Sequence, residues 1–531
     1  MLLKSYSIRP ISPMKQLLFF VVIALLGCQT DHNKATAQSK KIPATTPNIL
    51  IIYADDLGYG DVSAYDQGTL KTPNIDQLAT SGIRFTNGYA TSATCTPSRF
   101  ALLTGTYPWR NENAKILPGD APLLIDTAAV TVASMLKKQG YATGVVGKWH
   151  LGLGNGNVDW NKAIAKTPND LGFDESYIMA ATGDRVPTVY VENRKVAGLQ
   201  ASDPLYVSYE KNFPGQPTAL TNPELMTKMK WHHGHNQSVV NGIPRIGFMK
   251  GGKTAVWTDE TMADVFLSKA EAFIDRHKKN PFFLYYALHE PHVPRVPGEK
   301  FAGKSGLGPR GDAILEADWC VGEIMKKLKT DGLLDNTLVI LSSDNGPVLN
   351  DGYYDEAVEK NGKHTPWGKF RGGKYSLFDA GTHVPFIVSW PSRIKKGVSD
   401  AVVCQVDLLA SLAALVGSTD KTTDSENVLD ALLGKAKTGR PNLVLEASGR
   451  LAFRAGEWAF IPAYPGRPLN KEVNIETGLS QTPQLYNLQT DPGQRTNLAT
   501  TNPDKLADME KQMKQIVGAA YQAKTDELKL H

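Results

Sequence analysis

Five continuous apolar runs, each bounded by polar residues or glycine, constrain the fold of this 531-residue chain more than any other feature. They lie at residues 48–56, 142–150, 281–292, 336–346 and 383–391 and are typical of strands buried on both faces. Helical patterns precede the second, third and fourth runs, at residues 131–140, 260–280 and 311–332. Because strands that alternate with helices build parallel sheets, we predict an α/β fold with a large, mostly parallel sheet flanked by helices.

We expect this sheet and its helices to form one large α/β domain at residues 47–417. The sequence pattern changes after this domain. Residues 442–463 alternate apolar and polar side chains as antiparallel strands do, and residues 502–524 have the spacing of an amphipathic helix. We therefore expect a smaller C-terminal α+β subdomain at residues 418–531. The formal net charge of +5 is small for this length, and no basic helix stands out, so we expect no nucleic-acid partner.

The N-terminus has the composition of an export signal. Lys15 precedes an apolar stretch at residues 17–26, which is too short to span a membrane as a helix. The sequence "LLGC" that ends at Cys28 resembles a bacterial lipoprotein box, in which the cysteine is lipidated; a plain secretory signal cut elsewhere is the alternative. We expect a lipoprotein signal peptide at residues 1–28 and a flexible tether at residues 29–46.

These features predict an exported protein in the periplasm or at the cell surface. We expect it to be anchored to the outer membrane, with contact to the membrane only through the N-terminal lipid.

Polar side chains follow four of the predicted strands at the point where each strand ends. These residues are Asp55 and Asp56, Lys148 and His150, His289 and His292, and Asp344 and Asn345. Because ligands bind beyond the carboxyl ends of parallel strands, we expect the four exits to form one site. A single "DD" or "DN" pair is more often a cap or a turn, but four such exits together indicate a shared function.

The acidic members of this set predict a metal site. Asp55, Asp56, Asp344 and Asn345 offer carboxylate and amide oxygens, which suit calcium or magnesium better than zinc. Three carboxylates in one crevice would repel each other strongly without a cation.

Cys95 lies at the predicted start of a helix, since Pro97 suits a first helical turn. The N-terminus of a helix favours an anion, and Arg99, one turn along, faces the same side. The stretch therefore indicates a nucleophile in an anion-binding pocket. Cys320 and Cys404 occur in apolar patterns instead, and we expect them to be core thiols.

The stretch "CTPSR" at Cys95–Arg99, followed by "LLTG", resembles the signature of the type I sulfatases, and most of the chain is similar to this family. Further similar motifs follow in the family's order: "ADDLGYGD" at 54–61, "GKWHLG" at 147–152, "PHVP" at 291–294, "SSDNG" at 342–346, "GGKYSLFDAGTHVPFIVSWP" at 372–391 and "PQLYNLQTDPGQRTNLA" at 483–499. The resemblance implies an alkaline-phosphatase/sulfatase-like fold.

The resemblance also implies the cofactors. A maturase that recognises Cys95–Arg99 would oxidise Cys95 to formylglycine (3-oxoalanine). The modified Cys95 would bind one calcium ion together with Asp55, Asp56, Asp344 and Asn345. The activity implied is the hydrolysis of sulfate monoesters on a carbohydrate through a covalent sulfo-enzyme, with release of inorganic sulfate.

Catalytic roles follow from the same resemblance. Arg99 would steady the hydroxyls of the hydrated aldehyde, and His150 would remove the proton from the second hydroxyl. Lys148 and Lys374 would bind the sulfate oxygens. His292 would protonate the leaving oxygen, a role for which His289 in "HEPH" is the alternative.

The expected substrate is a sulfated saccharide, namely one with a sulfated galactose or N-acetylgalactosamine residue at a chain end, which is desulfated during polysaccharide degradation. Five polar residues are candidates for contacts to its sugar hydroxyls: Asp184, Arg185, His232, His235 and His289. A second metal at "HHGH", residues 232–235, would lack a carboxylate or cysteine to complete its ligand set.

Two other functions compete with this interpretation. A phosphatase or phosphodiesterase of the alkaline-phosphatase superfamily would carry serine or threonine where Cys95 stands, and histidine where Asn345 stands. A lipid-anchored glycan-binding protein without activity would have lost the nucleophile, a metal carboxylate or a sulfate-binding lysine, and all of these are present.

Overall fold

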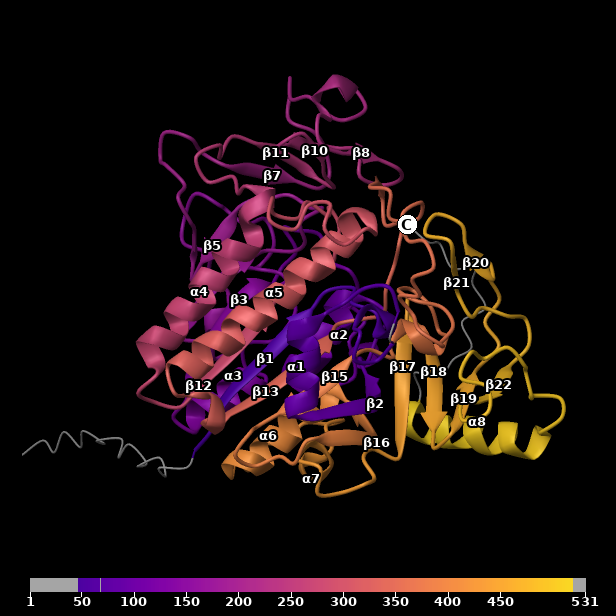
Figure 1. Cartoon of the computed structure of the whole chain (residues 1–531). Coiled ribbons are helices and arrows are strands. Elements are labelled where there is room, and N and C mark those ends of the chain that lie inside the picture. Colours follow the sequence, from indigo (N-terminus) through magenta and orange to yellow (C-terminus); the bar gives the residue numbers. More distant parts are fainter. Residues whose placement is uncertain (1–45, 67, 519–531) are drawn as a thin grey trace, which may run out of the picture. The chain divides into compact units, whose positions relative to one another are not determined.

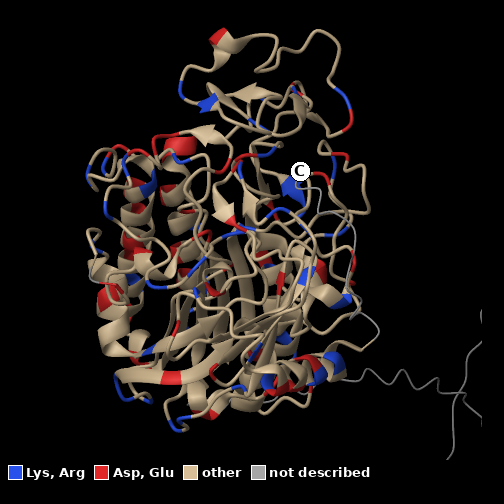
Figure 2. Ribbon diagram, turned by 90° about the vertical axis from the view of Figure 1, so that its right-hand side faces the viewer, with Lys and Arg blue, Asp and Glu red and all other residues tan. Residues whose placement is uncertain are grey.

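A ten-stranded sheet with helices on both faces dominates the computed structural model of the chain, which describes residues 46–66 and 68–518 (Figure 1). The predicted signal peptide with Cys28, and the tether up to residue 45, lie outside the described residues. Of the helices within the described ranges, none is long and apolar enough to cross a membrane. Lys and Arg are mixed with Asp and Glu along helices and loops (Figure 2).

The order of strands in the sheet is β16-β2-β15-β13-β1-β12-β3-β4-β5-β6. Their bounds are β1 Asn48–Ala54, β2 Ile83–Tyr89, β3 Ala142–Lys148, β4 Glu175–Met179, β5 Tyr190–Glu192, β6 Lys195–Val196, β12 Phe282–Ala287, β13 Thr337–Ser343, β15 Phe386–Ser389 and β16 Gly397–Cys404.

The centre of the sheet is parallel, as predicted, and its margins are mixed. Strands β13, β1, β12, β3 and β4 run parallel to one another. The fifth predicted strand, β15, is antiparallel to both of its neighbours. At one margin β16 pairs in parallel with β2. Of the nine strand pairings in this sheet, five are parallel and four are antiparallel.

Alternate side chains of the central strands enter two separate apolar cores. In β1, Ile49 and Ile51 face one core, and Leu50 and Ile52 face the other. The first core is closed by α2 (Cys95–Thr104), α3 (Val132–Lys138) and α6 (Leu408–Val416), and the second by α1 (Pro73–Ser81), α4 (Met262–His277) and α5 (Gly308–Thr330). The continuous apolar runs of the sequence are thus explained by burial on both faces.

The C-terminal region is a smaller antiparallel sheet covered by a helix, as the sequence predicts. Its strands are β17 (Asn442–Ala447), β18 (Arg450–Ala455), β19 (Trp458–Ile461) and β22 (Gln484–Asn487), and its helix is α8 (Pro503–Val517). One apolar cluster contains Leu443 and Met509 from this region as well as Tyr89 and Ala101 from the large domain.

Short elements complete the structure. They are α7 (Leu429–Leu432) and four two-stranded pairs, β7 (Tyr206–Ser208) with β11 (Phe248–Lys250), β8 (Lys230–Trp231) with β14 (Tyr353–Tyr354), β9 (Val239–Val240) with β10 (Ile243–Pro244), and β20 (Leu469–Asn470) with β21 (Ile475–Glu476).

Candidate active site

The four predicted strand exits meet at one place beyond the carboxyl ends of β1, β3, β12 and β13. Lys148 Nζ donates to Asp55 Oδ2 at 2.5 Å. The backbone N–H of Asp56 donates to Asp344 Oδ1 at 3.2 Å, and Asn345 Nδ2 donates to Asp56 Oδ1 at 2.7 Å. All five of these side chains are buried.

Carboxylate and amide oxygens in this cluster fit a hard cation. One oxygen each of Asp55, Asp56 and Asp344 lies within 4.8 Å of the others. Asp55 Oδ1 and Asn345 Oδ1 are buried and accept no hydrogen bond within the part of the chain that the structure describes. Burial, and next the neighbouring Asp344, raise the pKa of Asp55 well above its ordinary value. Because buried polar oxygens are rarely left unpaired, the cluster fits a hard divalent cation.

Two side chains of the site project from strained backbone. Asp56 and His150 have φ angles of 62° and 55°, in the left-handed region that residues other than glycine seldom adopt. Gly147, the residue before the end of β3, has a φ of 112°, and a Cβ there would lie 1.8 Å from the carbonyl oxygen of Ala287 on β12. Such strain persists where the surrounding packing imposes it, and it often marks functional positions.

Cys95 is the first residue of α2, as predicted, and it faces His150. Its Sγ lies 3.2 Å from His150 Nδ1, while His150 Nε2 lies 2.9 Å from the carbonyl oxygen of Leu117. Since only Nε2–H can donate to that carbonyl, a neutral His150 presents the Nδ1 lone pair to the sulfur. Burial, reinforced by Lys148, lowers the pKa of His150 well below its ordinary value, which favours this neutral form.

The thiol of Cys95 is itself a weak nucleophile in this setting. Its residue is only 2% exposed. Burial raises its pKa, although Lys148 and Lys374 oppose this effect. Reactive cysteines have lowered pKa values, so this environment disfavours the thiolate form of Cys95. Cys320 and Cys404 are buried in apolar clusters with free thiols, which confirms the prediction for both.

Arg99 forms a two-point hydrogen bond with Asp344 of the acidic cluster. Its Nε and Nη2 donate to Asp344 Oδ2 at 2.9 and 2.7 Å, and its Nη1 donates to the carbonyl oxygen of Lys148 at 3.2 Å. Arg99 therefore fixes Asp344 relative to the end of β3.

Lys374 lies between two buried carboxylates. Its Nζ donates to Asp56 Oδ2 at 2.9 Å and to Asp351 Oδ2 at 2.7 Å. Burial alone would lower the pKa of Lys374, but Asp351 and Asp56 more than offset burial and raise the pKa well above its ordinary value. Asp351 was missed by sequence reasoning, because its only signal, one aspartate in the loop "LNDGYY", equally describes a turn.

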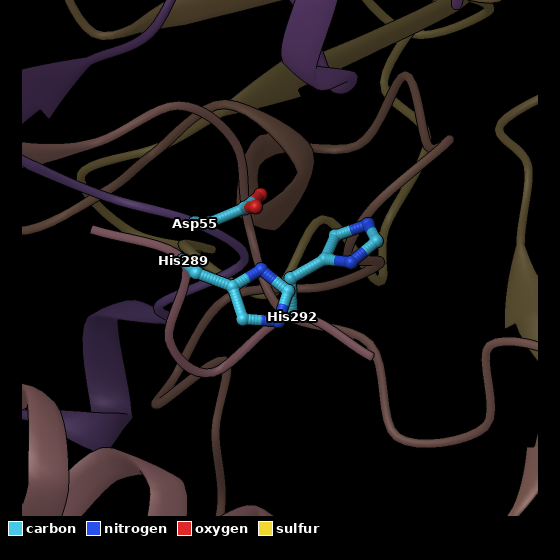
Figure 3. Close-up of side chains that lie close together, drawn as sticks. All are labelled: Asp55, His289 and His292. Atoms are coloured by element: carbon cyan, nitrogen blue, oxygen red, sulfur yellow. The ribbon is translucent and has the colours of Figure 1, made fainter. Parts of the chain in front are cut away.

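His289 and His292 lie beside Asp55 at the end of β12 (Figure 3). His292 Nδ1 lies 2.6 Å from the carbonyl oxygen of Val293, and its Nε2 lies 3.9 Å from Asp56 Oδ2. His289 Nδ1 is buried without a hydrogen-bond partner among the described residues. Burial, with a contribution from Lys148, lowers the pKa of His289 to about 3. The ring of His289 is therefore neutral and has an unused polar atom.

Three of the five residues expected to contact sugar hydroxyls, Asp184, Arg185 and His235, form a second polar cluster. Arg185 Nη1 donates to Asp184 Oδ2 at 2.8 Å, and His235 Nε2 lies 2.8 Å from the same oxygen. The ring of His232 packs against Tyr354, with a centroid distance of 4.9 Å, and Tyr354 is 63% exposed.

The chain belongs to the sulfatase family, whose model matches residues 47–418. It is therefore a sulfuric ester hydrolase, which favours the sulfatase interpretation of the sequence over the phosphatase and the inactive glycan-binding protein.

Similar proteins include an N-acetylgalactosamine-6-O-sulfatase from Bacteroides thetaiotaomicron. That protein is 50% identical over 493 residues, which cover 92% of this chain and 96% of the relative. Human arylsulfatase A is 32% identical over 475 residues, which cover 86% of this chain and 84% of the relative. A solved structure from a Bacteroides thetaiotaomicron locus for the metabolism of multiple glycosaminoglycans superposes with a TM-score of 0.87 at 49% identity, covering 89% of this chain and 99% of that chain.

Proposed function

We propose that this chain is a calcium-dependent sulfatase with formylglycine at position 95, and that it removes the 6-O-sulfate from N-acetylgalactosamine at the end of a sulfated glycan. The observation that carries this proposal is the contact between Cys95 and His150 beside the buried carboxylate cluster. The choice of sugar rests on the 50% identity to an N-acetylgalactosamine-6-O-sulfatase and agrees with the galactose or N-acetylgalactosamine expected from the sequence.

Asp55, Asp56, Asp344, Asn345 and the modified Cys95 would hold the calcium ion. When bound, the cation would supply positive charge that stabilises negative charge on the sulfate group. The hydrated aldehyde of formylglycine would supply one hydroxyl for attack and a second for release of sulfate.

The basic residues around position 95 would transfer a proton, bind sulfate and position the hydroxyls. His150 offers its Nδ1 lone pair to the side chain at position 95 and would accept a proton there. Lys148 and Lys374 extend ammonium groups to the carboxylate cluster and would bind sulfate oxygens. Arg99 would steady the hydroxyls at position 95.

His292 would protonate the leaving oxygen of the sugar. Its Nδ1–H is committed to a backbone carbonyl, so the proton would come from Nε2, and the ring must be the doubly protonated imidazolium to supply it. Asp184, Arg185 and His235 would hydrogen-bond the sugar hydroxyls, and His289 and His232 are further candidates for such contacts.

The cellular setting belongs to the same proposal. We infer export through the signal at residues 1–28, lipid attachment at Cys28, and action in the periplasm or at the cell surface. The division into a catalytic domain at 47–417 and a C-terminal subdomain at 418–531 is supported by the family match, which covers residues 47–418. A maturase acting on Cys95–Arg99 would be a required partner.

A panel of sulfated sugars tests the activity. The protein, co-expressed with a formylglycine-generating maturase, is incubated with N-acetylgalactosamine-6-sulfate, N-acetylgalactosamine-4-sulfate, N-acetylglucosamine-6-sulfate and 4-nitrophenyl phosphate, and released anion is measured. We expect sulfate release from the first sugar to exceed that from the others. Preference for the phosphate ester would contradict the proposed reaction, and preference for another sugar would contradict the proposed substrate.

Mass spectrometry tests the modification independently of activity. The peptide that contains Cys95 should be about 18 Da lighter than its cysteine form, since the thiol is replaced by an aldehyde. An unmodified thiol in fully active protein would exclude the proposed nucleophile.

A further inference from the structure

Arg295 is a buried arginine that joins the loops around the candidate active site. Its side chain is fully buried. The guanidinium donates to the carbonyl oxygens of Pro291 at 2.9 Å, Val348 at 3.0 Å and Leu349 at 2.7 Å. A fourth hydrogen bond of 2.8 Å reaches the carboxylate of Asp355. Because the guanidinium is planar and rigid, these bonds fix the loops relative to one another.

One loop held by Arg295 carries His292, and the other contacts Lys374, the two residues to which the proposed function assigns the leaving oxygen and the sulfate group. Pro291 directly precedes His292. The other loop, which contains Pro347 and Asp351, forms two hydrogen bonds with Lys374. The carbonyl oxygen of Pro347 accepts from the backbone N–H of Lys374 at 2.9 Å, and Asp351 accepts from its Nζ at 2.7 Å. Arg295 therefore connects, through hydrogen bonds, the loop that carries His292 to the loop that contacts Lys374.

We propose that Arg295 is a positioning residue that sets the distance between His292 and Lys374, so that the leaving oxygen is protonated while the sulfate group is held. This inference rests on the proposed function, because it assigns His292 to the leaving oxygen and Lys374 to sulfate. Misplacement of a reacting group by about 1 Å can cost about 100-fold in rate.

A double-mutant cycle on the saccharide substrate tests the inference. Arg295→Lys keeps the positive charge beside Asp355 but cannot reproduce the hydrogen bonds to three carbonyl groups. We expect it to lower kcat/KM about 10- to 100-fold in the wild-type background and less than about 3-fold in a His292→Ala background. The same factor in both backgrounds would overturn the inference, because a purely structural defect is independent of His292.

Arg310→Lys is the matched control. Arg310 also donates to the carbonyl oxygen of Val348, at 3.2 Å, but its other hydrogen bonds, of 2.8 and 2.6 Å, go to Asp61 and not to the loop of His292. We expect Arg310→Lys to lower kcat/KM by the same factor in both backgrounds. Formylglycine content and melting temperature are measured for every variant, so that rates refer to folded, modified protein.

Two further results are decisive. If Arg295→Lys does not fold, Asp355→Asn replaces it in the same cycle with the same two outcomes, because it removes only the carboxylate partner of Arg295. If His292→Ala keeps wild-type activity on the saccharide, the proposed role of His292 is wrong and the inference falls with it. If His292→Ala lowers activity, but Arg295→Lys lowers kcat/KM by the same factor in both backgrounds, the role of Arg295 is rejected and the proposed function stands.

Discussion

At the scale of single residues, the candidate site buries three carboxyl groups whose negative charge the neighbouring basic side chains only partly balance. Burial raises the pKa of Asp55 and of Asp56, whereas Arg99 and Lys148 outweigh burial at Asp344 and lower its pKa. Two of the three carboxylates are thus disfavoured as anions by their surroundings. A divalent cation would reverse this for both, which is the electrostatic argument for a metal at this position.

Outside the acidic cluster of the candidate site, the buried carboxyl group of Glu316 on α5 makes stability depend on pH. Burial, and next the neighbouring Glu290, raise the pKa of Glu316 from its ordinary value of 4.5 to about 8. Asp264 raises this pKa further, Lys300 lowers it, and Glu316 Oε1 accepts from the backbone N–H of Gly298 at 3.1 Å. In the folded protein the carboxyl group therefore retains its proton at pH values where the unfolded chain releases it.

We predict that Glu316→Gln stabilises the protein increasingly as pH rises from 4.5 to 8. Over that window the unfolded chain binds fewer protons than the folded protein, so wild-type stability falls by up to about 1.4 kcal/mol per pH unit from this group. Glutamine keeps the acceptor for Gly298 and has no proton to lose. The difference in melting temperature between variant and wild type, measured at several pH values, should grow with pH; parallel curves would show that Glu316 is ionised in the folded protein.

At the scale of elements, the turn before α2 explains the serine of "CTPSR". Ser98 Oγ accepts from the backbone N–H of Ser92 at 3.1 Å and donates to the carbonyl oxygen of the same residue at 2.9 Å. Both residues are fully buried. One hydroxyl therefore closes the turn that places Cys95 at the helix start.

We predict that Ser98→Ala destabilises the protein and slows turnover. It leaves a buried N–H and a buried carbonyl of Ser92 unpaired, at about 1–3 kcal/mol each. Melting temperature and kcat per formylglycine-containing chain are the measurements. Thr104→Val removes a hydroxyl at the other end of the same helix, where Oγ1 donates to the carbonyl oxygen of Phe100 at 2.8 Å, and should lower stability without changing kcat. Equal kcat values in both variants would exclude a special role for the Ser98 turn.

Site residues that follow regular strands could be predicted from the sequence, whereas those in irregular loops could not. The site residues Asp55, Lys148 and Asp344 could be predicted, because strands buried on both faces appear as long apolar runs. The polar residues stand at the end of these runs in the sequence. Asp351 could not, since its contact with Lys374 depends on how an irregular loop packs and not on any periodic pattern. The antiparallel direction of β15 was equally hidden, because a buried strand has the same apolar sequence in either direction.

At the scale of the whole molecule, the C-terminal sheet is part of the site's support. The backbone N–H of Ala93 donates to the carbonyl oxygen of Glu446 on β17 at 2.8 Å, and the N–H of Glu446 donates to the carbonyl oxygen of Thr91 at 3.0 Å. The segment that leads into Cys95 is thus paired with a strand of the C-terminal region. Apolar side chains of both regions share one buried cluster.

We predict that a chain ending at residue 418 does not fold, although the family match ends there. The truncation removes Leu443, Phe453, Leu485 and Met509 from the shared cluster. Their absence exposes the apolar side chains of the large domain that share this cluster, such as Tyr89, Tyr107 and Val406, and each fully buried apolar side chain contributes about 1.5–3 kcal/mol against the 5–15 kcal/mol of a typical domain. Soluble yield, near-UV circular dichroism and thermal unfolding are compared with the full chain. Residues 419–531 supplied as a separate chain should restore folding; a cooperative transition in the truncated chain alone would instead establish 47–417 as an independent domain.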